Sequence, residues 1–185
     1  MYMMRRQCAA SSIRHKPRIN METVFLNGNP MHLCGELPKV GTEAPEFALV
    51  GRDLSDIALH DYRGKRVVLN IFPSLDTDVC AASVRHFNKE ASELPNTVVL
   101  CVSKDLPFAA ARFCTVNGID NVATASGFRS DFGHNYGVEL VDGPLRGLYA
   151  RALVVIDKDG KVMGTSLCDQ ITEEPDYEFV KKLLA

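Results

Sequence analysis

Two runs of β-branched and apolar residues, with a helical pattern between them, constrain the fold more than any other feature of this chain. The first run, at residues 66–72, is nearly continuous and is ended by Pro73, as expected of a strand buried on both faces. Apolar residues then recur every three or four positions from Cys80 to Leu94, the pattern of one face of an α-helix. A second buried run follows at residues 97–102. Strand, helix and strand in this order predict a right-handed parallel crossover in an α/β sheet.

The ends of the predicted helices carry recognisable signals. Asp76 or Thr77 can cap the start of the first helix. Residues 105–107, which end in proline, open a second helix, and Gly118 is expected to stop it. A second helix that follows a second buried strand continues the alternating pattern.

Further strands are expected on both sides of this unit. An Asn-Gly pair lies between short apolar stretches within residues 23–34, and it predicts a β-hairpin because both turn positions tolerate positive φ. Later in the chain, residues 152–156 and 162–167 flank an Asp-Lys-Asp-Gly turn. An amphipathic helix over about residues 175–184 is the last predicted element.

The predicted elements follow the order β-hairpin, βαβα, a less certain middle, and ββα. This is the order of a thioredoxin-like α/β fold with an N-terminal β-hairpin extension. No internal repeat, low-complexity segment or linker divides the chain. We therefore expect residues 21–185 to form one domain, large enough to hold a core without disulfides or a structural metal.

Composition and charge narrow the class of protein. The chain has 185 residues, of which 46% are hydrophobic and 24% charged, as in ordinary soluble globular proteins. No apolar run approaches the roughly 20 residues of a membrane span. Because five of the 21 basic residues lie before Met21, the remainder holds 16 basic against 23 acidic residues. This acidic body argues against nucleic acid or an anionic membrane as the main partner, and we expect a cytoplasmic protein.

The first twenty residues differ from the rest of the chain. They hold basic residues and no acid, and their apolar stretch is too short and too polar for a secretory signal peptide. Their composition also suits an organelle transit peptide or an upstream start before Met21. We expect residues 1–20 to form a tail that plays no part in folding.

Six cysteines occur in the chain, at positions 8, 34, 80, 101, 114 and 168. No Cys-x-x-Cys pair and no histidine at ligand spacing accompanies them, so a structural zinc site is not expected. Cys101 lies within a predicted strand and Cys168 just after one, and both are interpreted as buried apolar residues. Cys8 and Cys34, in the tail and in a loop, have no chemical context.

Cys80 lies in the first turn of a predicted helix. Unpaired N–H groups and the helix dipole favour an anion there, and a thiolate is stabilised at such a position. Thr77 supplies a hydroxyl one helical turn earlier. Because Cys80 also belongs to the apolar face of the helix, a reactive thiol and a packing residue both remain open interpretations.

The segment from Pro73 to Cys80 resembles the peroxidatic motif Pro-x-x-x-Thr-x-x-Cys of peroxiredoxins. The similarity extends from about Glu22 to the end of the chain, and it is to the thiol peroxidase subfamily of atypical two-cysteine peroxiredoxins. The supporting stretches are residues 24–30, 53–56, 69–74, 79–85, 105–109, 112–114, 142–145, 150–152 and 174–177.

This resemblance implies a function and a set of site residues. Cys80 matches the peroxidatic cysteine and Cys114 the resolving one, while Thr77, Pro73 and Arg151 match the other active-site residues. Cys80 is then expected to form a sulfenic acid and afterwards a disulfide with Cys114. The implied substrates are hydrogen peroxide and organic hydroperoxides, the implied reductant is thioredoxin, and the implied assembly is a homodimer. No metal, flavin or haem is needed.

Each of these residues also has a purely structural interpretation. Arg151 could be a surface arginine at the start of a strand, and Cys114 an apolar residue at the end of a helix. Thr77 could be an N-cap, and Pro73 could simply end a strand.

Two other functions are compatible with the same fold. A thiol–disulfide oxidoreductase or isomerase normally has a close cysteine pair at the helix start, but position 77 is threonine. A non-catalytic binding or holdase-like protein is the second alternative, because a fold does not dictate a function.

Overall fold

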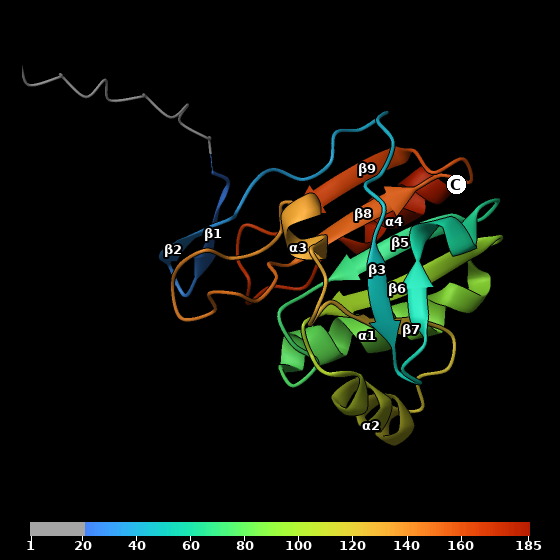
Figure 1. Ribbon diagram of the computed structural model, residues 1–185, viewed down its shortest axis with the longest axis horizontal. Helices are drawn as coiled ribbons and strands as arrows, with labels where there is room; N and C mark the ends of the chain where they lie inside the picture. Colours follow the sequence, from blue (N-terminus) through green and yellow to red (C-terminus); the bar gives the residue numbers. More distant parts are fainter. Residues whose placement is uncertain (1–20) are drawn as a thin grey trace, which may run out of the picture.

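The computed structural model describes residues 21–185, which form a β-hairpin and a seven-stranded sheet with helices on both faces (Figure 1). The expectations for residues 1–20, including Cys8, lie outside the described residues. Within residues 21–185, no helix is long and apolar enough to cross a membrane.

The central strands are those that the sequence pattern predicts. β5 (Arg66–Ile71) and β6 (Thr97–Ser103) pair in parallel, and β8 (Ala152–Ile156) joins β5 on its other side in antiparallel orientation. Every residue of β8 is buried, because both faces of the sheet are covered. The order is β4-β3-β7-β6-β5-β8-β9, completed by β3 (Ala48–Gly51), β4 (Asp56–Ala58), β7 (Ala123–Ser126) and β9 (Val162–Leu167).

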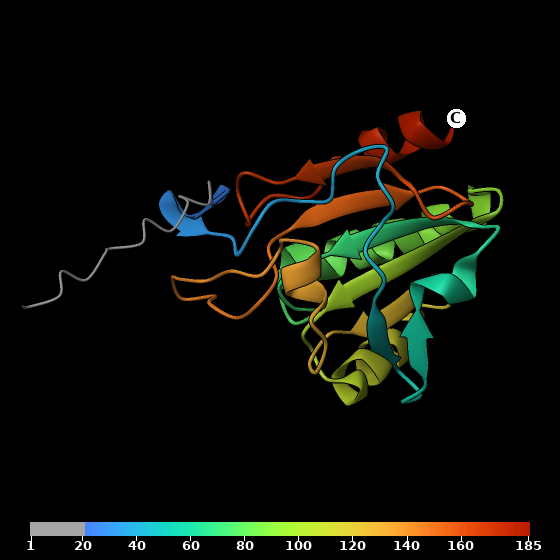
Figure 2. The same ribbon diagram turned by 45° about the horizontal axis from the view of Figure 1, so that its top comes forward.

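Helices cover the two faces of the sheet and share two apolar cores with it (Figures 1 and 2). One face packs against α1 (Asp78–Glu90, followed by a 3₁₀ turn at Ala91–Glu93), α2 (Pro107–Asn117) and α4 (Tyr177–Leu184). The other packs against the short helix α3 (Phe132–Asn135) and a 3₁₀ turn at Leu59–Tyr62. The layers therefore bury the central strands from both sides.

The helix ends follow the expected signals with one exception. Gly118 ends α2 in the left-handed region, with φ 62°. Asp176 caps α4, where its carboxylate accepts from the Phe179 N–H at 3.1 Å. Thr77 occupies the N-cap position of α1, but its side chain makes no capping bond. The Thr77 hydroxyl donates to the Ser74 carbonyl oxygen instead, at 3.1 Å, so the prediction of a capping hydroxyl at Thr77 is wrong.

Two strands are not predicted by the sequence pattern, β7 in the middle of the chain and β4 before β5. β7 has the sequence Ala-Thr-Ala-Ser and pairs with both β6 and β3, while β4 is a three-residue edge strand. Their side chains are mostly short or polar. Their extended conformation therefore comes from pairing with neighbouring strands rather than from their own propensity.

The N-terminal hairpin lies at the end of the sheet where β5 and β6 end (Figures 1 and 2). It consists of β1 (Thr23–Leu26) and β2 (Asn29–His32), joined by the predicted Asn-Gly turn with φ angles of 50° and 80°. The Phe25 N–H donates to the Asp169 carbonyl oxygen at 2.7 Å, and the Ile171 N–H donates to the Phe25 carbonyl oxygen at 2.9 Å. These two bonds fix the loop that follows β9 against the hairpin.

Candidate active site

Cys80 lies in the first turn of α1, after the loop that leaves the central strand β5. Its side chain is fully buried and packs in the core between the helices and the sheet. The thiol thus occupies both the apolar face of α1 and the start of the helix. Its position fits both sequence interpretations, and the sulfur atom also contacts a charged group.

Arg151 brings a positive charge to the sulfur atom of Cys80. Its Nη2 donates to the Cys80 Sγ at 3.3 Å. β8 pairs with β5 so that Ala152 lies opposite Ile71, and the residue before β8 therefore falls beside the loop that leads to Cys80. Only 1% of Arg151 is exposed, so the interpretation as a surface arginine is wrong. The guanidinium therefore places a positive charge and a hydrogen-bond donor at this sulfur atom.

The guanidinium of Arg151 is held on one side and free on the other. Its Nε and Nη2 both donate to the carbonyl oxygen of Ile171, at 3.1 and 2.9 Å. Its Nη1 is buried and has no hydrogen-bond partner among residues 21–185. Because a buried donor without a partner is costly, Nη1 is suited to bind an oxygen atom that enters with a substrate.

A cavity of about 220 Å³ lies beside this pair. Pro73, Thr77 and Arg151 line it, and Cys80 lies behind its wall without exposed surface. The rest of the wall is largely apolar and comes from the hairpin, α1 and the loops before β8 and after β9: Leu26, Val79, Leu145, Leu148 and Ile171. The fold therefore places three of the five predicted site residues in the wall of an apolar cavity and a fourth, Cys80, in contact with one of them.

Thr77 and Pro73 present different chemistry to this cavity. Thr77 is exposed, and its hydroxyl oxygen retains acceptor capacity while its proton is donated to Ser74. Pro73 is buried and has no N–H, so it adds wall without adding a donor.

Cys114 stands apart from this group. It lies in the last turn of α2, is 2% exposed, and its Sγ is 3.8 Å from the Thr124 hydroxyl oxygen. It belongs to the same core as Cys80, but it does not line the cavity beside Arg151. All five cysteines among the described residues are free.

Burial disfavours the thiolate form of the three other described cysteines. Burial raises the pKa of Cys101 to about 12 and that of Cys168 to about 11. Burial also raises the pKa of Cys34, whose thiol donates to the Gly133 carbonyl oxygen at 3.4 Å. The prediction of a buried residue is confirmed for Cys101, whereas Cys168 is only half-buried. Among residues 21–185, no group of three or more His, Cys, Asp or Glu side chains could hold a metal ion.

Asp105 is a polar residue beside the site. In the sequence it belongs to the stretch 105–109 that supports the family resemblance, but nothing there gives it a role. Its carboxylate accepts from the Ser74 hydroxyl at 2.8 Å and from the Leu75 N–H at 2.7 Å, within the loop between Pro73 and Thr77. The available signal is its position just after β6, because the carboxyl ends of neighbouring parallel strands lie together.

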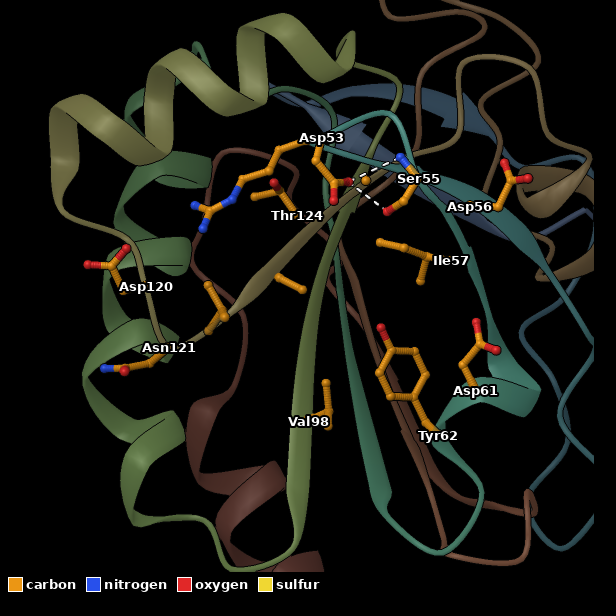
Figure 3. Close-up of a pocket in the computed structure, with 14 residues that line it drawn as sticks. Asp53, Ser55, Asp56, Ile57, Asp61, Tyr62, Val98, Asp120, Asn121 and Thr124 are labelled. Carbon is orange, nitrogen blue, oxygen red and sulfur yellow. Dashed lines mark hydrogen bonds between the residues drawn. The ribbon is translucent and has the colours of Figure 1, made fainter.

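A larger and more open cavity, of about 730 Å³, contains none of these residues (Figure 3). It lies at the β3–β4 turn and the start of β7, and Figure 3 shows the Asp53 carboxylate there with its bonds from Ser55. The hydrogen bond from the Ser55 hydroxyl, 2.6 Å long, lowers the pKa of Asp53 below its ordinary value. Because this cavity holds no thiol, it is not the candidate site.

Comparisons with known proteins agree with this geometry. The model of the Redoxin family matches residues 39–181. The chain belongs to the Redoxin family. Thiol peroxidase from Corynebacterium glutamicum is 51% identical over 158 residues, which cover 85% of this chain and 96% of the relative. Thiol peroxidase from Mycobacterium bovis is 54% identical over 158 residues, covering 85% and 95%. The crystal structure of a peroxiredoxin-like protein from Aquifex aeolicus has a TM-score of 0.83 and 43% identity, covering 88% of this chain and 96% of that one.

These similarities confirm two expectations about this Redoxin family member. The resemblance to thiol peroxidases, expected from about Glu22 to the end of the chain, holds over most of its length. The thioredoxin-like fold with an N-terminal hairpin is confirmed as well. The protein is therefore an enzyme of the peroxiredoxin type.

Proposed function

We propose that this Redoxin family enzyme reduces hydroperoxides with Cys80 as the attacking thiol and Cys114 as the resolving thiol. The observation that carries the proposal is the buried contact of 3.3 Å between Arg151 Nη2 and Cys80 Sγ beside an apolar cavity. A buried guanidinium at a thiol favours the nucleophilic thiolate, which a packing cysteine would not need.

The first step is attack of the Cys80 thiolate on one peroxide oxygen. The S–O bond forms as the O–O bond breaks, the departing oxygen takes a proton and leaves as water or an alcohol, and Cys80 becomes a sulfenic acid. Arg151 Nη1 is a free donor that can hold the departing oxygen while negative charge builds on it. Thr77 orients the peroxide from the cavity wall, and Pro73 keeps water from the sulfur.

The cavity supports organic hydroperoxides as substrates in addition to hydrogen peroxide. Most of its wall away from Thr77 and Arg151 is apolar, and its volume of about 220 Å³ exceeds what hydrogen peroxide needs. An alkyl substituent in this cavity would bury apolar surface, which favours binding by about 25 cal/mol per Å² removed from water.

The second step joins the two cysteines. The Cys114 thiolate attacks the Cys80 sulfenic sulfur, a disulfide forms, and the sulfenic oxygen leaves as water with a proton. Both thiols are buried and lie at opposite ends of different helices, while a disulfide needs Cα atoms within about 7 Å. We therefore propose that the first turn of α1, the last turn of α2 or both unwind. Thioredoxin then reduces the disulfide by thiol exchange and becomes oxidised itself, and we expect this cycle in the reducing cytoplasm.

An exposed apolar patch supports a homodimer. Leu106, Phe108 and Phe128 are exposed, and their segments adjoin because the Gly127 N–H donates to the Ser103 carbonyl oxygen at 2.8 Å. Exposed apolar patches of this kind commonly mark contact surfaces. If this patch is the dimer contact, Phe108→Asp shifts the sedimentation coefficient of the protein from dimer to monomer, whereas Val116→Asp, an exposed apolar residue on the same helix, does not.

A coupled assay with thioredoxin, thioredoxin reductase and NADPH tests the proposed function. We expect consumption of hydrogen peroxide and cumene hydroperoxide by the wild type and none by Cys80→Ser. A thiol–disulfide oxidoreductase would instead accelerate the reduction of insulin without consuming peroxide. Full peroxidase activity of Cys80→Ser, or insulin reduction alone, would overturn the proposal.

A further inference from the structure

One carboxylate links the two segments of chain that lead to Cys80 and to Cys114. Asp105 lies between β6 and α2, and its Oδ1 accepts from the Ser74 hydroxyl at 2.8 Å. Its Oδ2 accepts from the Leu75 N–H and from the Ser103 hydroxyl, both at 2.7 Å. Hydrogen bonds to a carboxylate are stronger than those between neutral groups, so these three bonds, called the Asp105 anchor below, hold the two segments together.

The anchored loop carries Thr77 and leads directly into the turn of Cys80. The Ser74 carbonyl oxygen accepts from both the backbone N–H and the hydroxyl of Thr77, at 3.2 and 3.1 Å. The Thr77 carbonyl oxygen in turn accepts from the Ala81 N–H at 2.9 Å, which closes the first turn of α1. A chain of hydrogen bonds thus runs from Asp105 through Ser74 to the turn that holds the thiol.

Asp105 is equally tied to the start of α2. The carbonyl oxygen of the next residue, Leu106, accepts from the N–H groups of Ala109 and Ala110 at 2.9 and 3.1 Å. The carbonyl oxygen of Asp105 itself accepts from the Ser126 hydroxyl of β7. The backbone around Asp105 is therefore bonded to the sheet, and the carboxylate bonds the loop before α1 to this backbone.

We propose that Asp105 is a positioning residue that acts in opposite directions on the two steps of the reaction, which rests on the roles proposed for Cys80 and Cys114. In the attack step it holds Thr77 and the first turn of α1 in the geometry that places Cys80 at Arg151. In the resolution step the same bonds oppose the unwinding of that turn, so they delay the disulfide. Asp105 touches neither substrate nor sulfur.

The two opposed effects distinguish positioning from a general contribution to stability. A residue that only stabilises the fold would leave the attack rate unchanged as long as the protein is folded. Loss of the Asp105 anchor is expected to slow attack and to speed resolution. Because a sulfenic acid that is resolved sooner is exposed to a second peroxide for less time, it should also form less sulfinic acid.

The test follows both steps in the reduced full chain by rapid mixing with hydrogen peroxide, with mass spectrometry of Cys80 at high peroxide. For Asp105→Ala we expect attack slower by about tenfold, faster disulfide formation, and a smaller sulfinic fraction than in the wild type. Asp105→Asn, which keeps the shape and part of the hydrogen bonding, should fall between the two. Asp53→Ala is the control. The Asp53 carboxylate also accepts from a serine hydroxyl and a backbone N–H, but it lies at the β3–β4 turn, so this variant should have the rates and the sulfinic fraction of the wild type.

Two results would overturn the inference. Unchanged rates in both Asp105 variants would mean that the hydrogen bonds to this carboxylate have no kinetic role, and slowing of both steps together would mean that they do not oppose the unwinding of the Cys80 turn. If Asp105→Ala does not fold by circular dichroism, Ser74→Ala, which removes a single bond to the carboxylate, must show the same opposed changes in weaker form. A wild type that does not oxidise Cys80 at all would instead refute the proposed function.

Discussion

Arg151 and Cys80 are 71 residues apart in the sequence, and the Nη2 of the first lies 3.3 Å from the Sγ of the second in the core of the protein. The antiparallel pairing of β8 with β5 brings the two segments together. The carbonyl oxygen of Ile171 fixes the guanidinium in this orientation, and the N–H of the same residue donates to the Phe25 carbonyl oxygen of the N-terminal hairpin. The hairpin thus supports the active site indirectly, through the loop that follows β9.

Replacement of Arg151 should slow the attack on peroxide more than it alters the fold. Arg151→Met removes the charge beside the Cys80 sulfur atom and the free donor Nη1, and we expect the second-order rate of Cys80 oxidation to fall by roughly 100-fold. Arg151→Lys keeps the charge but not the paired bonds to Ile171, so it should recover only part of the rate. Rapid mixing with hydrogen peroxide measures these rates.

A matched control for this experiment is Arg52, which also donates to a backbone carbonyl oxygen, that of Ile119 at 3.2 Å. Arg52→Met should react with peroxide as fast as the wild type. Equal rates in Arg151→Met and the wild type would exclude a role of the guanidinium in the attack.

The two cysteines should differ in a single turnover. In the proposed mechanism Cys80 attacks and Cys114 only resolves, so Cys80→Ser should consume no peroxide, whereas Cys114→Ser should consume one equivalent and then stop. Quantification of peroxide against enzyme, without a recycling system, measures this difference. Cys34→Ser, which alters a half-buried thiol outside the cavity, should behave as the wild type. Loss of the first equivalent in both active-site variants would contradict the assignment of roles.

The parts of the fold that the sequence predicts are those with a strong local pattern. The apolar run of β5 and the periodic apolar residues of α1 identify these elements without any tertiary information. The short strands β4 and β7 lack such a pattern, because pairing across the sheet gives them their conformation.

The same distinction applies to the candidate site. Cys80 and Thr77 share one segment whose spacing is visible in the sequence, and Arg151 and Cys114 were expected from the family resemblance. The carbonyl oxygen of Ile171 and the carboxylate of Asp105 act through contacts between distant segments. No local sequence pattern predicts such contacts, since they depend on how distant strands pair.

A buried polar pair behind Cys80 should contribute to stability. The Ser83 hydroxyl donates to the Cys80 carbonyl oxygen at 2.8 Å and accepts from Asn70 Nδ2 at 3.2 Å, within an otherwise apolar core. Ser83→Ala leaves the buried amide of Asn70 with a weaker set of partners, and we expect it to lower the free energy of unfolding by about 1–3 kcal/mol. Urea denaturation measures this change.

The double variant provides the control for that prediction. Asn70→Leu together with Ser83→Ala removes both polar partners, so it should be less destabilised than Ser83→Ala alone. The amide oxygen of Asn70 has no partner among the described residues, which adds to this expectation. If the double variant has a lower free energy of unfolding than Ser83→Ala, the hydrogen bond between Asn70 and Ser83 stabilises the protein by more than the burial of the two polar groups costs.

The buried thiol of Cys101 and the half-buried thiol of Cys168 should resist alkylation at pH 8. A pKa raised to about 12 for Cys101 and to about 11 for Cys168 means that little thiolate exists below pH 9, and only the thiolate reacts. We expect iodoacetamide at pH 8 to modify both at least about tenfold more slowly than a free cysteine of pKa about 8.5. As the pH rises, Cys168 should gain reactivity before Cys101. Peptide mapping by mass spectrometry follows each site, and rapid modification of Cys101 at pH 8 in the folded protein would contradict its burial.

Oxidation should loosen the two helices without loosening the sheet. Cys80 and Cys114 are buried on the inner faces of α1 and α2, and the proposed bond between them is expected to form with helical turns opened. Amide hydrogen exchange should therefore quicken within residues 77–84 and 110–118 when the disulfide forms. The strands at residues 67–72 and 152–156 contribute side chains to both cores, and their amide protons should stay protected from exchange.

The test compares amide exchange of the reduced and the oxidised protein, after mass spectrometry has confirmed the Cys80–Cys114 bond. Unchanged protection in both helical segments would mean that the thiols meet without unwinding, and the resolution step would then need a different geometry.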